Sequence, residues 1–325
     1  MKKSKIFVTQ PSLPKLKDLE PYLKKIWDSK IVSNNGPLHK KLEDQLCKYL
    51  DVPFVSLVSN GTIGLIIALK ALEIKGEVIT TPYSFVATAH SLIWNKNKPI
   101  FIDIDPNTLN LDPKKIESAI TNRTTAIMPV HVYGNPCDVD MIENIAKKNN
   151  LKVIYDASHA FGVNGHSGSI LNHGDLSVLS FHATKVFNTF EGGAIISHDK
   201  KIKDRIDQIK NFGLIGETNI EKIGINGKMN EFSAAIGLLQ LKQIDKDIEK
   251  RKIIYEAYQK GLNKIRGIKC HTFLKMKKNN YSYFPIFVED NYPLTRDQLY
   301  NNLKNSGING RRYFYPLITE FAIYK

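Results

Sequence analysis

The chain has 325 residues, of which 42% are hydrophobic and 24% are charged. This composition and length are those of a globular protein with a large core, so a peptide, a disulfide scaffold and a disordered protein are excluded. The three cysteines (Cys47, Cys137 and Cys270) are far apart and form no CxxC pattern, which argues against a disulfide framework or a zinc site. No stretch approaches the roughly 20 apolar residues of a membrane span, and the basic start lacks the apolar segment of a signal peptide. We therefore expect a cytoplasmic protein with no membrane partner and no bound metal.

The balance of charges is strongly basic. Lys and Arg number 46 against 32 Asp and Glu, which gives a net charge of +14. Such a charge can indicate an anionic partner, for example a nucleic acid or a phosphorylated small molecule. The basic residues are spread along the chain, however, so we interpret most of the charge as solvated surface and expect no nucleic-acid partner.

Strand-like and helix-like segments alternate over most of the chain. The expected strands are 53–60, 77–82, 99–105, 124–134, 151–158, 176–183 and 192–199, and the expected helices between them are 61–76, 84–95 and 139–150. A further helix is expected to begin at Pro113, with Asp112 as its N-cap. This alternation predicts an α/β fold, in which helices cover both faces of a mainly parallel sheet.

The pattern changes at about Asn230. Residues 230–265 have one helical periodicity, and they are followed by an expected strand at 281–289, a helix at 294–307 and a strand at 309–317. Thr295 and Gln298 form a capping-box pattern at the start of the second helix, and Gly307 marks its end. We therefore expect a large domain over residues 1–240 and a smaller α+β domain over residues 241–325.

A candidate anion site lies at Ser59-Asn60-Gly61-Thr62, where the first strand meets the first helix of the alternating region. The free backbone N–H groups and the dipole of a helix start attract phosphate. Gly61 permits close approach, and the hydroxyls of Ser59 and Thr62 can add hydrogen bonds. The alternative is an ordinary turn with a Ser or Thr cap, which is the commoner case for such a segment alone.

Two further strand ends carry candidate chemical groups. Asp156, in KVIYDASHAFG, follows an apolar strand, and ligands bind at the carboxyl ends of strands in open α/β sheets; the alternative is an N-cap for the next turn. His159 can reach the same place if the chain turns, although a lone histidine is more often a surface or packed side chain. Lys185, in FHATKVFNTFEGG, follows another strand, and it is either one more surface lysine or an amine that forms a Schiff base with an aldehyde cofactor.

The three features together indicate one kind of site. A phosphate-binding helix start, a strand-end carboxylate and a strand-end lysine, in this order, are the parts of a pyridoxal phosphate site. The helix start would hold the phosphate, Asp156 would pair with the pyridine nitrogen, and Lys185 would hold the reactive carbon of the cofactor.

Six segments resemble the DegT/DnrJ/StrS family of nucleotide-sugar aminotransferases. They are SNGTIGLIIALKAL, ITTPYSFVATAHSL, PVHVYGNPCDVDMI, YDASHAFG, SFHATKVFNTFEGGAI and INGKMNEFSAAIGLLQL, and they follow this order over nearly the whole chain. FHATKVFNTFEGGAI and GRRYFYPL are similar to the members that make dTDP-4-amino-4,6-dideoxyglucose. The resemblance implies a fold-type I enzyme that uses pyridoxal 5′-phosphate and works as a homodimer with shared active sites.

The resemblance also implies roles for particular residues. Lys185 would be the catalytic Schiff-base lysine, Asp156 would pair with the pyridine nitrogen, and His159 would lie near the ring hydroxyl or ring face. Further cofactor contacts would come from Gly61, Thr62 and Ser180 at the phosphate, from Phe85 stacked on the ring (unless it is a core aromatic), and from Asn226 at the phosphate of the neighbouring subunit. The residues expected at the nucleotide sugar are Arg311, Arg312, Tyr313 and Tyr315.

The implied reaction transfers an amino group from L-glutamate to a nucleotide-linked 4-keto-6-deoxy sugar, with dTDP-4-keto-6-deoxyglucose as the expected acceptor. Three alternatives remain: a 3-keto sugar aminotransferase of the same family, a pyridoxal phosphate-dependent sugar dehydratase, and a non-catalytic regulator of the same fold. The dehydratase alternative resembles relatives that carry histidine at the position of Lys185, so Lys185 argues against it. Family members usually continue well past the YFYPL motif, so we expect the small domain to be incomplete.

Overall fold

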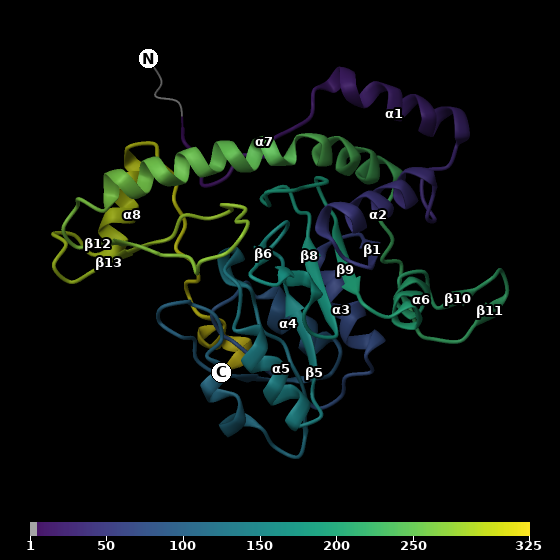
Figure 1. The fold of residues 1–325 in the computed structure, drawn as a ribbon, viewed down its shortest axis with the longest axis horizontal. Coiled ribbons are helices and arrows are strands. Elements are labelled where there is room, and N and C mark those ends of the chain that lie inside the picture. Colours follow the sequence, from purple (N-terminus) through teal and green to yellow (C-terminus); the bar gives the residue numbers. More distant parts are fainter. Residues whose placement is uncertain (1–4) are drawn as a thin grey trace.

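A seven-stranded sheet forms the centre of the protein in the computed structural model, which describes residues 5–325. Helices surround the sheet, and α7 lies across one end of it (Figure 1). The α-helices are α1 (Leu16–Ser29), α2 (Pro37–Leu50), α3 (Gly61–Ala71), α4 (Ala87–Trp94), α5 (Val139–Lys148), α6 (Lys200–Ile209), α7 (Glu231–Leu262) and α8 (Arg296–Asn305). The strands of the large sheet are β1 (Phe54–Val58), β2 (Glu77–Thr80), β3 (Lys98–Phe101), β4 (Thr124–Ile127), β5 (Lys152–Asp156), β8 (Leu176–Ser180) and β9 (Gly193–Ser197).

The order of the strands brings three chain segments to one edge of the sheet. The order is β1-β9-β8-β5-β4-β2-β3, and β9 runs antiparallel to both of its neighbours. The other pairs are parallel, so β1, β5 and β8 all point in the same direction. Their carboxyl ends therefore meet at a single edge, where ligands bind in open α/β sheets.

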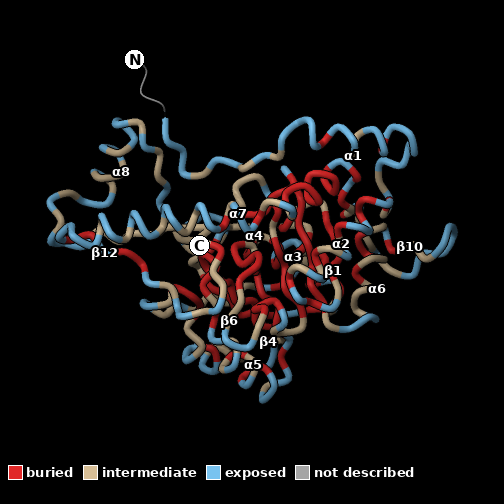
Figure 2. The backbone as a smooth tube through the Cα atoms, turned by 45° about the horizontal axis from the view of Figure 1, so that its top comes forward, coloured by how far each residue is buried: buried red, intermediate tan, exposed pale blue. Residues whose placement is uncertain are grey.

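Alternate residues of the strands feed cores on opposite faces of the sheet. In β5, Ile154 packs with α3 on one face, whereas Val153 and Tyr155 pack with α5 on the other. Another core lies between the sheet and the helices α2 and α7, with Leu42 and Leu46 fully buried in it. Burial is concentrated in and around this sheet (Figure 2). The prediction of a mainly parallel sheet with helices on both faces is confirmed.

The long predicted helix is a single unbroken element, α7. Its first half packs on α1 and α2 and is buried as far as Ile248, and its second half contacts the segment 273–284 through Tyr255 and Tyr258. The predicted domain boundary at residue 240 lies within α7, and the division into two domains there remains a prediction. None of the helices in residues 5–325 is long and apolar enough to cross a membrane.

The C-terminal part is small and mixed. β12 (Ile268–Cys270) pairs antiparallel with β13 (Ile286–Val288), and α8 begins with the predicted capping box. The predicted stop at Gly307 is confirmed, because this residue has a φ of +85° just after the helix. The remaining strands form the hairpins β6 (Asn164–Gly165) with β7 (Gly168–Ser169), and β10 (Leu214–Ile215) with β11 (Asn219–Ile220).

Two predicted elements are wrong. Residues 309–317 form no strand, because Tyr313 and Phe314 pack their rings into an aromatic cluster and the carbonyl of Tyr313 accepts hydrogen bonds from side chains instead of a neighbouring strand. The predicted helix at Pro113 is reduced to two 3₁₀ turns, η1 (Pro113–Lys115) and η2 (Glu117–Ala119), although Asp112 caps the first as expected. The remaining 3₁₀ turns are η3 (Val132–Gly134), η4 (Ile170–Asn172), η5 (Ile318–Glu320) and η6 (Ala322–Tyr324).

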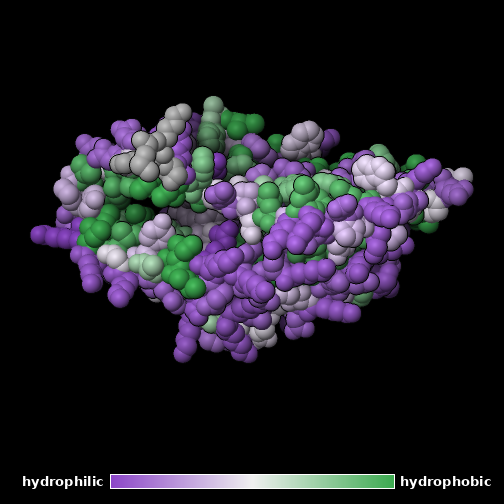
Figure 3. Space-filling view, turned by 90° about the horizontal axis from the view of Figure 1, so that it is seen from above, coloured by the Kyte–Doolittle hydropathy of each residue, from purple (hydrophilic) through white to green (hydrophobic). Residues whose placement is uncertain are grey.

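Many apolar side chains are exposed at the surface. On the face seen from above, they lie among polar ones (Figure 3). Trp27 on α1 and Ile223 beyond the β10–β11 hairpin are 72% and 81% exposed.

The start of α2 is held by a carboxylate from the start of α7. The Glu231 side chain is buried, and its two oxygens accept hydrogen bonds from the backbone N–H groups of Leu38 and His39, both at 2.8 Å. Gly36, the N-cap of α2, supplies no side-chain cap. Glu231 therefore satisfies the first N–H groups of α2 in place of a local cap, and its charge suits the positive end of that helix.

We predict that Glu231→Ala lowers the free energy of unfolding by roughly 2–4 kcal/mol, since it leaves two buried N–H donors without an acceptor. Urea denaturation at fixed protein concentration measures the change. The matched control is Glu249→Ala on the exposed face of α7, for which a change below about 0.5 kcal/mol is expected. Equal effects of the two substitutions would contradict the capping role.

Candidate active site

Asp156 is the last residue of β5, and its carboxylate is buried at the edge where β1, β5 and β8 end. Its Oδ2 accepts a hydrogen bond from the Thr88 hydroxyl at 2.7 Å, and its Oδ1 accepts from the backbone N–H and the hydroxyl of Ser158 at 3.1 and 2.6 Å. The carboxylate therefore lies at a strand end and caps the following turn, while its role in binding a ligand remains a prediction. A carboxylate has about four lone-pair positions, so these three bonds leave room for one further donor.

The orientation of Asp156 is fixed by side chains that the sequence analysis did not identify. The Thr88 hydroxyl gives its one proton to Asp156, so it accepts the hydrogen bond from Ser84, 2.7 Å away. Thr88 belongs to α4 and Ser84 to the loop before it. Ser158 lies two residues after Asp156, a spacing typical of an Asx turn, and this signal could have identified it.

Lys185 lies in the connection between β8 and β9, at the same edge of the sheet. Burial lowers the pKa of its amine to about 8, and the negative charge of Asp156 acts in the opposite direction. Among residues 5–325 its side chain forms no ion pair or hydrogen bond. A substantial fraction of the amine is therefore neutral near pH 8, which is the form that attacks a carbonyl carbon.

The N-terminus of α3 lies beside the end of β8. A Cβ atom built on Gly61 would lie 2.9 Å from the Cβ of Ser180, so only glycine lets these two segments approach so closely. The N-cap is Asn60, whose side chain accepts from the N–H of Ile63 at 2.9 Å, and not Ser59 or Thr62 as the ordinary-turn alternative expected. The N–H groups of Gly61 and Thr62 have no partner within the helix, so they are available to an anion.

His159 is buried beside Lys185 and lies within a group of aromatic rings. The rings of Tyr283 and Tyr133 have their centroids 4.5 and 6.4 Å from that of His159, and Phe314 stacks parallel to it at 6.4 Å. Burial and the nearby charge of Lys185 lower the pKa of His159 well below its usual range. None of the three ring partners was identified from the sequence as part of a site with His159, because they come from distant segments with no shared motif.

Two of the predicted cofactor residues, Phe85 and Asn226, are exposed and form no side-chain hydrogen bond within residues 5–325. Phe85 precedes α4, with 64% of its surface exposed. Asn226 is exposed too, and it pairs with Asn211 through an isolated antiparallel bridge. Their predicted contacts are with a bound ring and with a neighbouring subunit, so the expected roles of both residues remain predictions.

The four predicted substrate residues lie in three different environments. Arg312 forms an ion pair with Asp297 at 3.0 Å, and its guanidinium lies over the rings of Tyr300 and Tyr315. Tyr313 belongs instead to the aromatic cluster next to His159, because its ring lies 5.5 Å from that of Tyr283 and its carbonyl accepts from Tyr83 at 2.8 Å. Arg311 is exposed, and within residues 5–325 it forms no ion pair.

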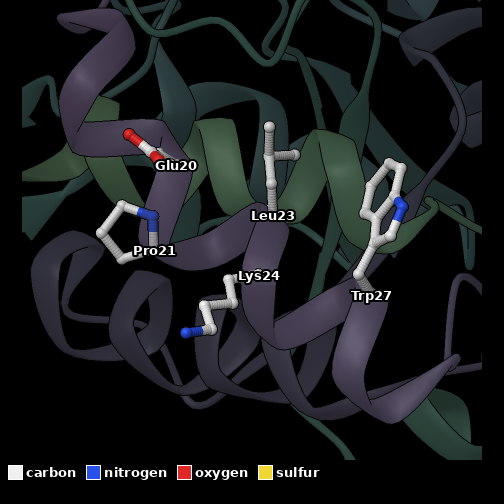
Figure 4. A pocket seen from close by; sticks show the side chains of 5 residues that line it. All are labelled: Glu20, Pro21, Leu23, Lys24 and Trp27. Carbon is white, nitrogen blue, oxygen red and sulfur yellow. The ribbon is translucent and has the colours of Figure 1, made fainter.

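A hollow on α1 and the distribution of potential metal ligands indicate no second site in the described part of the chain. The hollow, of about 540 Å³, is lined by side chains of α1 alone and includes none of the predicted site residues (Figure 4). No group of three or more potential metal ligands occurs in residues 5–325. The residues that line the hollow are Glu20, Pro21, Leu23, Lys24 and Trp27.

The residues present at the sheet edge fit pyridoxal phosphate. Asp156 can accept one more hydrogen bond, the N–H groups at Gly61 and Thr62 can receive a phosphate, and the amine of Lys185 has no competing partner in the described chain. These are the anchors that the cofactor requires at its pyridine nitrogen, its phosphate and its aldehyde carbon.

We predict that Lys185 in the cofactor-free protein reacts with an acetylating reagent with a pH midpoint near 8, which quantitative peptide mass spectrometry can measure. Asp156→Asn should lower this midpoint, because the carboxylate charge favours the protonated amine. Asp204→Asn, on the exposed face of α6, should leave the midpoint unchanged. A midpoint above 10 in the unmodified protein would contradict the assigned environment of Lys185.

The known proteins with similar sequences include two sugar transaminases. A dTDP-4-amino-4,6-dideoxy-D-glucose transaminase of Shigella dysenteriae is 60% identical over 319 residues, covering 98% of this chain and 87% of that protein. A transaminase of the same name from Escherichia coli is 51% identical over 98% of this chain and 86% of its own length. The crystal structure of DesI with its TDP-sugar product has a TM-score of 0.93 at 33% identity, covering 99% of this chain and 82% of that one.

The crystal structure of NtdA from Bacillus subtilis, with the cofactor PMP bound, has a TM-score of 0.87 at 28% identity, over 94% of this chain and 71% of that one. The model of the DegT/DnrJ/EryC1/StrS aminotransferase family matches residues 16–325. The predicted fold type and family are confirmed, and the chain belongs to the DegT/DnrJ/EryC1/StrS aminotransferase family.

Proposed function

We propose that this protein transfers the amino group of L-glutamate to carbon 4 of dTDP-4-keto-6-deoxyglucose, with pyridoxal 5′-phosphate as its cofactor. The observation that carries the proposal is the meeting of Gly61, Asp156 and Lys185 at one sheet edge, with an open acceptor position on Asp156. The choice of sugar follows the two transaminase relatives that are 60% and 51% identical to this chain.

Each group of the site has a chemical task in this reaction. Pyridoxal phosphate, when bound, supplies a conjugated ring that takes up the negative charge developed on the carbon that loses its proton. Asp156 keeps a positive charge favourable at the pyridine nitrogen, and the start of α3 holds the phosphate. The Nζ atom of Lys185, with a pKa lowered to about 8, can both accept a proton from a substrate carbon and return it near neutral pH.

We predict that the purified protein, supplied with pyridoxal phosphate and L-glutamate, converts dTDP-4-keto-6-deoxyglucose to a 4-amino-4,6-dideoxy sugar nucleotide. Mass spectrometry detects the amine, and NMR of the product gives the carbon that bears it. Lys185→Ala should lower kcat at least about 10³-fold because it removes the proton-transfer group, whereas Lys304→Ala on exposed α8 should not. A 3-amino product, or loss of water without amination, would replace the proposal by the corresponding alternative.

We propose further that two copies of the chain share their active sites. The β10–β11 hairpin projects from the body of the protein (Figure 1), and the exposed apolar residues Ile220 and Ile223 lead directly into Asn226. Phe212, at the other end of this segment, is 48% exposed. Exposed apolar side chains on such a projection are suited to contact with a second copy, and a twofold dimer would use them reciprocally.

We predict that mixing Lys185→Ala and Asn226→Ala proteins restores activity. If each site takes Lys185 from one subunit and Asn226 from the other, a mixed dimer holds one doubly damaged site and one intact site. Random exchange then gives roughly a quarter of the wild-type activity. Confirmed subunit exchange without any gain over the two parents would show that the sites are not shared.

A further inference from the structure

The turn η3, which contains Tyr133, packs against His159. Tyr133 has φ 59° and ψ 11°, in the left-handed region that side chains disfavour. The next residue, Gly134, has a φ of +83°, and a Cβ atom there would lie 2.8 Å from the carbonyl oxygen of His159. Costly backbone conformations of this kind persist where the surroundings enforce them, and they are concentrated at functional sites.

This conformation aims the backbone N–H of Tyr133 at the imidazole ring. The N–H donates to Nδ1 of His159 at 3.1 Å. The rest of His159 is held as well, since its carbonyl accepts from Asn280 at 2.8 Å and its ring lies 4.5 Å from that of Tyr283. Because Nδ1 accepts a hydrogen bond, it carries a lone pair, and a neutral imidazole then carries its proton on Nε2.

The second ring nitrogen of His159, Nε2, is available to a ligand. No hydrogen bond to Nε2 forms within residues 5–325, yet this atom is not sealed in the interior as Nε2 of His131 and His271 are. In a doubly protonated ring, Nδ1 would carry a proton that faces the backbone N–H of Tyr133. Two hydrogen-bond donors would then meet without an acceptor, which disfavours the charged ring. Burial next to Lys185 lowers the pKa of His159 and disfavours that charged form for a second, independent reason.

We propose that Tyr133 is a positioning residue: its left-handed backbone fixes His159 as the neutral Nε2–H tautomer, so that His159 presents a hydrogen-bond donor to the cofactor. The part that concerns the cofactor rests on the proposed function. In this arrangement His159 donates a hydrogen bond and does not act as a base.

The side chain of Tyr133 explains why glycine does not occupy this position. Its hydroxyl lies 2.9 Å from that of Tyr83, which donates its proton to the carbonyl of Tyr313 at 2.8 Å. The ring also stacks parallel to Phe314 at 6.2 Å. The turn is therefore anchored to the C-terminal segment, and these contacts stabilise a backbone conformation that the residue itself disfavours.

The tautomer is measured directly by long-range ¹H–¹⁵N NMR of cofactor-free protein labelled with [¹⁵N]histidine, with His159→Gln identifying the signals. We expect an unprotonated Nδ1 and a protonated Nε2 for His159. An Nδ1–H tautomer or an imidazolium at pH 7.5 would overturn the proposal. The protein carries no cofactor in this measurement, so its outcome is independent of the proposed function.

Substitutions at residue 133 separate its backbone from its side chain. Tyr133→Phe keeps the N–H and should keep the tautomer, whereas Tyr133→Val places a β-branched residue at positive φ and should give a mixture of tautomers. Lys96→Val is the matched control, because Lys96 also has a φ of 60° but lies on an exposed turn after α4. An unchanged His159 signal in folded Tyr133→Val, checked by circular dichroism, would overturn the role of Tyr133.

The donor role is tested with pyridoxamine 5′-phosphate, which cannot link covalently to Lys185. The amide nitrogen of Gln can take the place of Nε2–H, whereas the shorter Asn cannot reach it. We therefore expect His159→Gln to bind this probe within about twofold of wild type, and His159→Asn to bind it about fivefold or more weakly, as for loss of one hydrogen bond. Equal affinities of the two variants by absorbance titration would overturn the donor role.

Discussion

The site depends on the buried carboxylate of Asp156. A charge removed from water is tolerated only where hydrogen bonds replace the lost hydration, and Thr88 and Ser158 supply three of them. These donors come from α4 and from the turn after β5, so the carboxylate ties the helix on one face of the sheet to the strand edge. One acceptor position of the carboxylate remains free. A protonated ring nitrogen could donate to this position, and its positive charge would balance the buried negative charge of Asp156.

Burial lowers the pKa of two neighbouring bases, Lys185 and His159, but the two side chains have different tasks. It lowers the pKa of Lys185 to about 8, where Asp156 partly opposes the shift, and it lowers that of His159 well below its usual range. Near neutral pH the lysine can therefore exist in both protonation states, as a group that moves a proton must. The histidine stays neutral, and the N–H of Tyr133 on its Nδ1 decides which nitrogen carries the proton.

The sequence predicted correctly those features that depend on neighbouring residues alone, such as strand ends and helix caps. Asp156 and Lys185 could be placed at strand ends because apolar runs precede them, and the capping box at Thr295 forms as its pattern indicates. Thr88, Tyr133 and Tyr283 could not be connected with them, since their contacts arise from strand order and from turns with no sequence signature. Residues 309–317 alternate like a strand, but aromatic packing of Tyr313 and Phe314 replaces the strand pairing there.

The packing of the segment around Tyr313 also affects which of its two arginines is free to bind an anionic substrate. Arg312 is neutralised by Asp297 and held over two tyrosine rings on the α8 side. Its neighbour Arg311 forms no ion pair within residues 5–325, and its positive charge acts on Tyr283, a ring that contacts His159. A guanidinium that is already paired loses that interaction when it binds an anion, whereas an unpaired one does not. Of the two predicted arginines, Arg311 is therefore the one whose charge remains available on the side of the aromatic cluster.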